Sequence, residues 1–220
     1  EKNIKNVGYG ILKILYSELE LDKFCKTKTR NRLFKYDFEL IFRLLVFSRV
    51  LYPASKRETY INRGFYFENF DGFSIDDVYH ALDPIDEHQE ALQKWIYDRS
   101  SKLCERDLSV AYFDCTNYYF DIGRPDVDIL NDEGQAVNEE GEVIEAKYRK
   151  RGPEKNRRPD PIVQMGLLMD RNSIPIAYDL FPGNESEKLH MRPIVNRVKS
   201  EFSDSRIIFV ADRGLNTSDN

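Results

Sequence analysis

The sequence predicts an α+β fold, in which an N-terminal all-helical region is followed by a mixed sheet with a flanking helix. Up to about residue 107, apolar residues recur at helical spacing. Beyond that point, short runs rich in Val, Ile, Phe and Tyr alternate with turn residues, as in strands. With 220 residues and 41% hydrophobic content, the chain can bury a core in each part. We therefore expect a helical region at residues 1–107 and a sheet region at residues 108–220.

The helical region contains apolar segments that end at helix-stopping residues. Pro53 and Gly64 close two of them, because proline cannot continue a helix and glycine favours its end. Ser74 is a predicted N-cap, and Pro84 is the predicted entry to a long amphipathic helix. The expected helices are GYGILKILYSEL, DFELIFRLLVFSRVLY, ASKRETYINRG, IDDVYHAL and PIDEHQEALQKWIYDRSSKLCE.

The sheet region contains strand-like runs and one helix before the last of them. Asp114 is predicted to end the first core strand, and Asp212 to end the last. A charged carboxylate at the end of a core strand costs free energy unless something binds it. The expected strands are LSVAYFDC, TNYYFD, IVQMGLLMD, IPIAYDLF and RIIFVAD, and the expected helix is EKLHMRPIVNRVKSEF.

An irregular insertion at residues 122–161 is acidic in its first part and basic in its second. One hypothesis is a solvated insertion whose two halves neutralise each other. The other is that residues 147–158 bind DNA phosphates and are poorly ordered without DNA. The candidate DNA-binding residues are Lys147, Arg149, Lys150, Arg151, Lys155, Arg157 and Arg158.

The order of the strands predicts where the two aspartates lie. In an RNase H-like sheet the first and last of these strands are neighbours, so Asp114 and Asp212 converge at one edge. Two adjacent carboxylates repel each other unless a cation lies between them, and Mg²⁺ or Mn²⁺ prefers such oxygen ligands. A pair of ions about 3.5–4 Å apart would activate a nucleophile and stabilise the leaving oxygen of a phosphodiester. We therefore expect both aspartates to be metal ligands.

Three segments together resemble the core motifs of DDE transposases from bacterial insertion sequences. They are YFDCTNYYF, RRPDPIVQMGLLMDRNSIPIAYDLFPGNESE and FVADRGLN, within residues 108–220. The resemblance implies an incomplete RNase H-like catalytic core with Asp114 and Asp212 as the first two catalytic acids. It implies metal-dependent DNA strand cleavage at the element's ends and strand transfer into target DNA. Its implied partners are double-stranded DNA, at transposon ends and target, and a second copy in a homodimer.

The third acid of that family, a glutamate, lies well downstream of the second aspartate. Only eight residues follow Asp212 in the sequence. We therefore expect the 220 residues alone to be inactive, as a fragment of a longer transposase or a truncated relative. The alternative function is a catalytically inactive, transposase-derived regulator that binds DNA. A phosphatase of the haloacid dehalogenase type is a further alternative, although Thr116 stands where its second acid is needed.

Other polar residues have structural as well as functional interpretations. Glu185 and Glu187 are either metal ligands or acids favoured at a helix start. Asp170 begins the turn DRNS, which explains an acid without chemistry. Arg213 either pairs with Asp212 or reaches a DNA phosphate. In the helical region, basic residues that can contact DNA are Lys26, Lys28, Arg30, Arg32, Lys35, Arg49, Lys56, Arg57 and Arg63.

Composition excludes several protein classes. A formal net charge of −5 argues against a protein that binds polyanions with its whole surface. No apolar run reaches the length of a membrane span, and we expect no membrane partner and a cytoplasmic location. The three cysteines are far apart and lack the paired spacing of a metal or disulfide framework.

Overall fold

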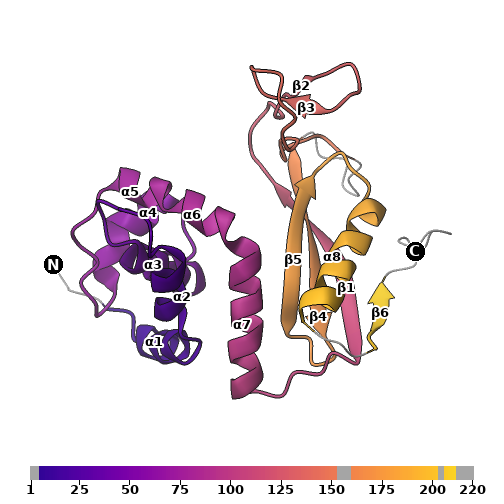
Figure 1. The fold of residues 1–220 in the computed structure, drawn as a ribbon. Helices are drawn as coiled ribbons and strands as arrows, with labels where there is room; N and C mark the ends of the chain where they lie inside the picture. The colour runs from indigo at the N-terminus through magenta and orange to yellow at the C-terminus, as the bar shows by residue number, and fades with distance from the viewer. Residues whose placement is uncertain (1–4, 153–159, 203–205, 212–220) are drawn as a thin grey trace. The chain divides into compact units, whose positions relative to one another are not determined.

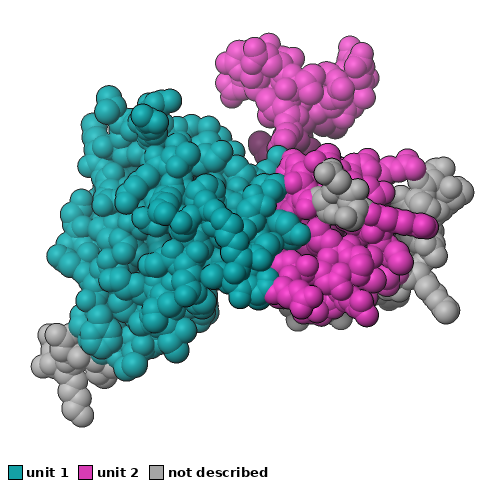
Figure 2. Space-filling model, turned by 60° about the horizontal axis from the view of Figure 1, so that its bottom comes forward, with its two compact units in different colours: residues 1–104 teal, residues 105–220 magenta. Residues whose placement is uncertain are grey.

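A computed structural model describes residues 5–152, 160–202 and 206–211. The chain divides into two compact units, residues 1–104 and residues 105–220 (Figure 2). The first unit is helical, and the second contains a mixed sheet with a flanking helix (Figure 1). The predicted α+β fold class is therefore confirmed.

The first unit is built from short and medium-length helices. Asp37 begins α3 with a side chain that accepts a hydrogen bond from the Leu40 N–H. Ser74 begins α5 with a reciprocal capping box to Asp77, as its position before an apolar run predicted. The described helices are α1 (Tyr9–Glu18), α2 (Leu21–Lys28), α3 (Phe38–Leu51), α4 (Lys56–Ile61), the 3-10 helix η1 (Asn62–Phe65), α5 (Ile75–His80), α6 (Leu82–Glu87) and α7 (Gln89–Leu103).

An aromatic core holds this unit together. Ile41, Leu44 and Phe47 follow each other at three-residue intervals on α3, and each is almost completely buried. The Phe47 ring packs edge-on against Tyr9 and Tyr16 of α1, with ring centroids 5.3 and 5.6 Å apart. Burial of this apolar face, rather than the propensity of any single helix, stabilises the unit.

Two details of the helical prediction are corrected. The long helix expected from Pro84 is two helices, because His88 adopts a non-helical backbone conformation between α6 and α7. Pro84 lies in the first turn of α6 rather than before it, where its missing N–H has no intrahelical partner to lose. The helix α2 was not predicted, because its charged sequence LDKFCKTK buries only a short stripe that includes Phe24 and Cys25.

The second unit contains a four-stranded sheet among its described residues. The strand order is β5-β4-β1-β6, with β1 antiparallel to β4, β4 antiparallel to β5, and β1 parallel to β6. This is the neighbour relationship expected of an RNase H-like sheet. The strands are β1 (Val110–Tyr119), β4 (Ile162–Asp170), β5 (Pro175–Pro182) and β6 (Ile208–Ala211).

The strand β1 is continuous, which corrects the expectation of two strands broken after Asp114. All residues from Ala111 to Tyr119 pair in register with β4. Asp114 therefore lies in the middle of a strand rather than at its end. It is tolerated there because its side chain is exposed, so the carboxylate keeps its hydration.

One face of the sheet is covered by the helix α8 (Glu187–Glu201), which packs over β4 and β5 (Figure 1). Ile194, Val195 and Val198 are its buried residues. On the sheet, the buried side chains of Ala111 and Phe113 alternate with the exposed ones of Tyr112 and Asp114 along β1. The helix-covered face is thus the core of this unit.

The insertion contains a short hairpin that was not predicted. The strands β2 (Ile129–Leu130) and β3 (Ala136–Val137) pair with each other in a separate small sheet. Asn131 fixes its turn by accepting hydrogen bonds from the backbone N–H groups of Glu133 and Gln135. Two-residue strands give too short a pattern for periodicity to detect.

None of the described helices is long and apolar enough to cross a membrane.

A buried ion pair locks the turn between β4 and β5. The Arg106 Nε donates to Asp170 Oδ2 at 2.5 Å, and the two side chains are 2% and 0% exposed. Asp170 Oδ1 accepts the backbone N–H groups of Asn172 and Ile174, and Arg106 Nη2 donates to the Pro175 carbonyl. Asp170 therefore has the structural turn role that its position in DRNS predicted.

Removal of one partner of this pair should strongly destabilise the second unit. We expect Asp170→Ala to lower the free energy of unfolding by about 3–5 kcal/mol, because the guanidinium of Arg106 stays buried without its counterion. Chemical denaturation followed by circular dichroism measures this loss. The control is Arg171→Ala, which breaks an exposed pair with Asp107 and should change stability by no more than about 1 kcal/mol. Equal effects of the two substitutions would contradict the structural role.

Candidate functional site

Asp114 projects from the exposed face of β1, opposite the face covered by α8. Its flanking same-face residues are Tyr112 and Thr116, which are also exposed. Its Oδ1 accepts the backbone N–H of Cys115 at 2.9 Å. The carboxylate is therefore held near the backbone and is open to solvent, as a metal ligand or a general base requires.

The strand that leads to Asp212 lies directly beside β1. In the parallel pairing of β1 with β6, Phe113 is the register partner of Ala211. Asp114 and Asp212 are the next residues of these two strands in the sequence. Asp212 itself and Arg213 lie outside the described residues, so their positions remain predictions.

A metal at this site needs more ligands than the described residues provide. Within the described ranges, no three His, Cys, Asp or Glu side chains are grouped so that they can hold a metal ion. Asp114 offers one hard oxygen ligand of the kind that Mg²⁺ or Mn²⁺ prefers. The described residues therefore fit a metal site only together with Asp212, which would supply a second carboxylate.

Cys115 lies on the opposite face of β1 and takes no part in this exposed site. Burial, together with the negative charges of Glu187 and Asp114, raises the pKa of its thiol to about 12. The thiol is therefore protonated at neutral pH and is a poor nucleophile and metal ligand. This excludes Cys115 from the chemistry of the exposed face.

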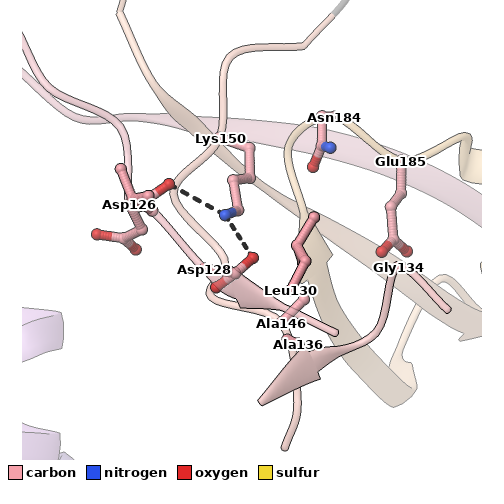
Figure 3. Close-up of a pocket in the computed structure, with 10 residues that line it drawn as sticks. Asp126, Asp128, Leu130, Gly134, Ala136, Ala146, Lys150, Asn184 and Glu185 are labelled. Atoms are coloured by element: carbon pink, nitrogen blue, oxygen red, sulfur yellow. Dashed lines mark hydrogen bonds and ion pairs between the residues drawn. The ribbon is translucent and has the colours of Figure 1, made fainter. Parts of the chain in front are cut away.

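The described part of the basic segment is bound to the acidic part of the same insertion, and Figure 3 shows this for Lys150. Arg149 donates through Nε and Nη2 to both oxygens of Asp126, at 3.1 and 2.6 Å. Lys150 Nζ donates to Asp128 Oδ2 at 2.6 Å and to the Asp126 carbonyl at 3.0 Å. Mutual neutralisation of the two halves, one of the two hypotheses for the insertion, thus describes these residues.

These contacts perturb the ionisation of both aspartates. The hydrogen bond from the Arg149 guanidinium holds the pKa of Asp126 below its usual value, against a smaller effect of burial. Burial alone would raise the pKa of Asp128, but hydrogen bonds from Lys150 and from the Lys147 backbone lower it overall. Both carboxyl groups are therefore ionised at neutral pH.

Backbone hydrogen bonds fix the start of the basic segment beside the main sheet. Lys150 and Ile162 exchange both N–H···O bonds, at 3.1 and 2.8 Å, and Gly183 N–H donates to the Tyr148 carbonyl. A Cβ on Gly152 would lie 1.6 Å from the Gly183 oxygen, so this close approach requires glycine there. These contacts hold residues 147–152 against the sheet, and residues 153–158 of the segment predicted to be poorly ordered lie outside the described residues.

The other candidate DNA-binding residues have mixed placements. Lys147 Nζ donates to the Val127 carbonyl, and Arg151 Nη2 to the Gly123 carbonyl, so both have backbone partners. In the first unit, Arg32 pairs with Glu87, and Arg63 pairs with Asp71. Lys155, Arg157 and Arg158 lie outside the described residues.

Polar residues in the loop before α8, and one in β4 that contacts this loop, have structural roles that the sequence did not reveal. Gln164, buried in β4, donates through Nε2 to the carbonyls of Gly183 and Glu185, both at 3.0 Å. Glu185 Oε2 lies 2.7 Å from His190 Nε2, and the His190 ring stacks on Phe181 with centroids 3.8 Å apart. An amide inside the apolar run IVQMGLL was the available signal for Gln164, because a buried amide must find partners.

A cavity of about 400 Å³ lies between the hairpin and this loop (Figure 3). Its walls include the paired Asp126, Asp128 and Lys150, together with Asn184 and Glu185. The cavity lies among the contacts that hold the insertion beside the main sheet. Its charged groups already have partners within the chain.

The ion pairs of the insertion predict a specific acid titration. Their contribution to stability is fully present above the unfolded aspartate pKa, about 3.9, and is lost as the pH falls through the lower folded value. Carboxyl ¹³C NMR should therefore give midpoints below about 3.9 for Asp126 and Asp128. In Arg149→Ala the Asp126 midpoint should rise towards the unfolded value, whereas Arg151→Ala should leave it unchanged. An Asp126 midpoint that does not change in Arg149→Ala would refute the ion pair between Arg149 and Asp126.

Comparisons with known proteins do not assign a family to the chain. No family model matches it, and no curated protein sequence matches it. Among solved structures, one match is described as "Mos1 transposase paired-end complex with left transposon end". It has a TM-score of 0.27 and 11% sequence identity, over 83% of this chain. The chain spans about half of that protein, 53% of its length, and a likeness of this size carries no argument about fold or function.

Proposed function

We propose that the chain belongs to a DDE-type transposase that cleaves DNA at the ends of an insertion sequence and transfers the strand to target DNA. Asp114 and Asp212 are its metal-binding catalytic acids, and its partners are double-stranded DNA and a second copy. The observation that carries the proposal is the parallel pairing of β1 and β6. Its register places Phe113 beside Ala211, the residues immediately before the two acids.

The chemistry follows from two carboxylates on neighbouring strands. Bound Mg²⁺ or Mn²⁺ would activate water or a 3′-hydroxyl and stabilise the leaving oxygen of a phosphodiester. Asp114 contributes a charged oxygen fixed by the Cys115 N–H on a rigid central strand. Its exposed position leaves room for a large substrate such as a DNA backbone, which a closed pocket would exclude.

DNA contact is supported by the place of the basic segment in the second unit. Lys150 is hydrogen-bonded to Ile162 at the start of β4, the strand that pairs with β1 along its length. The segment therefore leaves the sheet that bears Asp114. Arg149 and Lys150 have carboxylate partners within the chain, so contacts to phosphate are expected chiefly from Arg151, Lys155, Arg157, Arg158 and Arg213.

The metal-binding role of Asp114 can be tested without any DNA. Titration with Mn²⁺ should broaden the amide NMR signals of Phe113 and Cys115, because a paramagnetic ion at Asp114 lies next to them in the strand. The broadening should vanish in Asp114→Asn, which keeps the size of the side chain but removes the charge. Asp121→Asn is the matched control, since it removes a carboxylate just beyond the end of β1 and should leave the broadening intact. Broadening that survives Asp114→Asn would refute the assignment of Asp114 as a metal ligand. A wild-type chain that binds DNA but shows no Mn²⁺ broadening would favour the alternative function of an inactive regulator.

The DNA-binding role of the basic segment predicts a change in salt dependence. Each phosphate contact contributes a slope of about −0.9 in log affinity against log salt concentration. The triple substitution of Arg151, Arg157 and Arg158 by Ala should flatten the slope by up to about 2.7, whereas Arg149→Ala with Lys150→Ala should change it less. Fluorescence anisotropy on duplex DNA measures both slopes.

The control replaces the same three arginines by lysine, which keeps their charge and should preserve the slope. A slope that the triple alanine substitution leaves unchanged would show that the segment is a solvated loop. The hypothesis of a solvated insertion whose two halves neutralise each other would then hold for all of its basic residues.

A further inference from the structure

The helix α1 has apolar side chains on both of its faces. Its inner face contributes the buried Tyr9 and Tyr16 to the core of the first unit. Its outer face, continued into the residue before the helix, leaves large apolar side chains in solvent. These are Val7, Ile11, Ile14 and Leu15, which are 79%, 68%, 61% and 44% exposed.

The outer face is a contiguous stripe rather than a set of scattered residues. Val7, Ile11 and Ile14 are separated by four and three residues, the spacing that places side chains on one side of a helix. Gly10 lies on the same side, and a Cβ built there would meet nothing within 4 Å. At the N-terminal end, Asn6 N–H donates to the Phe65 carbonyl, and the Phe65 ring stacks on Tyr52. Both aromatic rings are exposed.

A helix that is apolar all round is normally buried on all sides. Within α1 only Lys13, Ser17 and Glu18 carry polar side chains other than tyrosine hydroxyls. Exposed apolar patches of this kind on soluble proteins mark interaction sites. The stripe is therefore a candidate for one side of a protein–protein interface.

We propose that the outer face of α1 binds α1 of a second copy of the chain, packed antiparallel across a twofold axis. A twofold interface brings the same patch of both copies together, so an apolar stripe meets an apolar stripe. Gly10 forms a notch in the stripe, and Ile14 of the partner helix is a knob of suitable size for it. One small residue among large ones in the stripe leaves a groove into which a large side chain of the partner helix can pack.

Charge favours the antiparallel orientation over the parallel one. The first turn of α1 has no acidic residue, and its last turn has no basic residue. Glu18 therefore lies at the negative end of its own helix dipole. In the antiparallel pair each Glu18 approaches the positive N-terminus of the other helix, where an acid is stabilised. A parallel pair would instead bring the two Glu18 side chains together.

The experiment measures the mass of the full 220-residue chain by sedimentation velocity at increasing concentration. The outer face of a ten-residue helix is small compared with the roughly 1,200 Å² in total that specific interfaces bury at least, so the dimer should dissociate on dilution. The double substitution Ile11→Lys and Ile14→Lys should give a monomer at all concentrations. Because both side chains are exposed, circular dichroism should show an unchanged fold.

The matched control places the same charges on apolar residues elsewhere on the first unit. Leu33→Lys with Ile61→Lys, both highly exposed, should leave the dimer intact. The orientation is tested by Glu18→Gln, which should weaken an antiparallel dimer, because the contact between an acid and the helix N-terminus is lost, and strengthen a parallel one, because the repulsion between two acids is removed.

A wild-type chain that is monomeric at every concentration would overturn the proposal, as would a dimer that resists the double substitution. Tighter association of Glu18→Gln would overturn the antiparallel geometry. This α1–α1 interface would form the homodimer of the proposed function, on which this inference rests. Because the measurement uses neither DNA nor metal, its failure is distinguishable from failure of the proposed catalytic chemistry.

Discussion

The alternation of side chains along β1 decides how the second unit is organised. This strand is central in the sheet, and its buried residues Ala111 and Phe113 face the side that α8 covers. The Phe113 ring occupies the space over Gly166, where a Cβ would lie 2.9 Å from the ring. A shift of one residue would bury Asp114 and expose Phe113, at a large cost in free energy. The core of this unit thereby fixes the carboxylate on the open face.

The same alternation explains why Asp114 needs no special compensation. In the prediction from sequence, a carboxylate at the end of a buried strand required a cation to stabilise it. In the structure the strand runs on to Tyr119, and the carboxylate is hydrated on the exposed face. A metal at Asp114 is thus compatible with the fold but is not needed to stabilise it. The argument for a metal rests on the neighbouring strand that leads to Asp212.

Much of the architecture could be predicted because it is encoded in local patterns. The capping residue Ser74, the strands β4 and β5 and the helix α8 each have a clear signal of period or punctuation. The break at His88 and the continuity of β1 depend on tertiary packing, which overrides local propensity. For the candidate site, the adjacency of β1 and β6 could be predicted. The partners of Arg149 and Lys150 could not, because 22 or more residues separate each pair in the sequence.

These partners link the charge of the insertion to its position. A DNA phosphate that bound Arg149 or Lys150 would have to replace Asp126 or Asp128, whose bonds hold the hairpin beside the sheet. Such an exchange of one anion for another yields little net electrostatic energy. It would, however, release the hairpin from its anchor. Because linkage is reciprocal, whatever holds the hairpin in place must weaken phosphate binding at these two residues by the same free energy. Under the proposed function, these ion pairs would therefore compete with DNA for the side chains of Arg149 and Lys150.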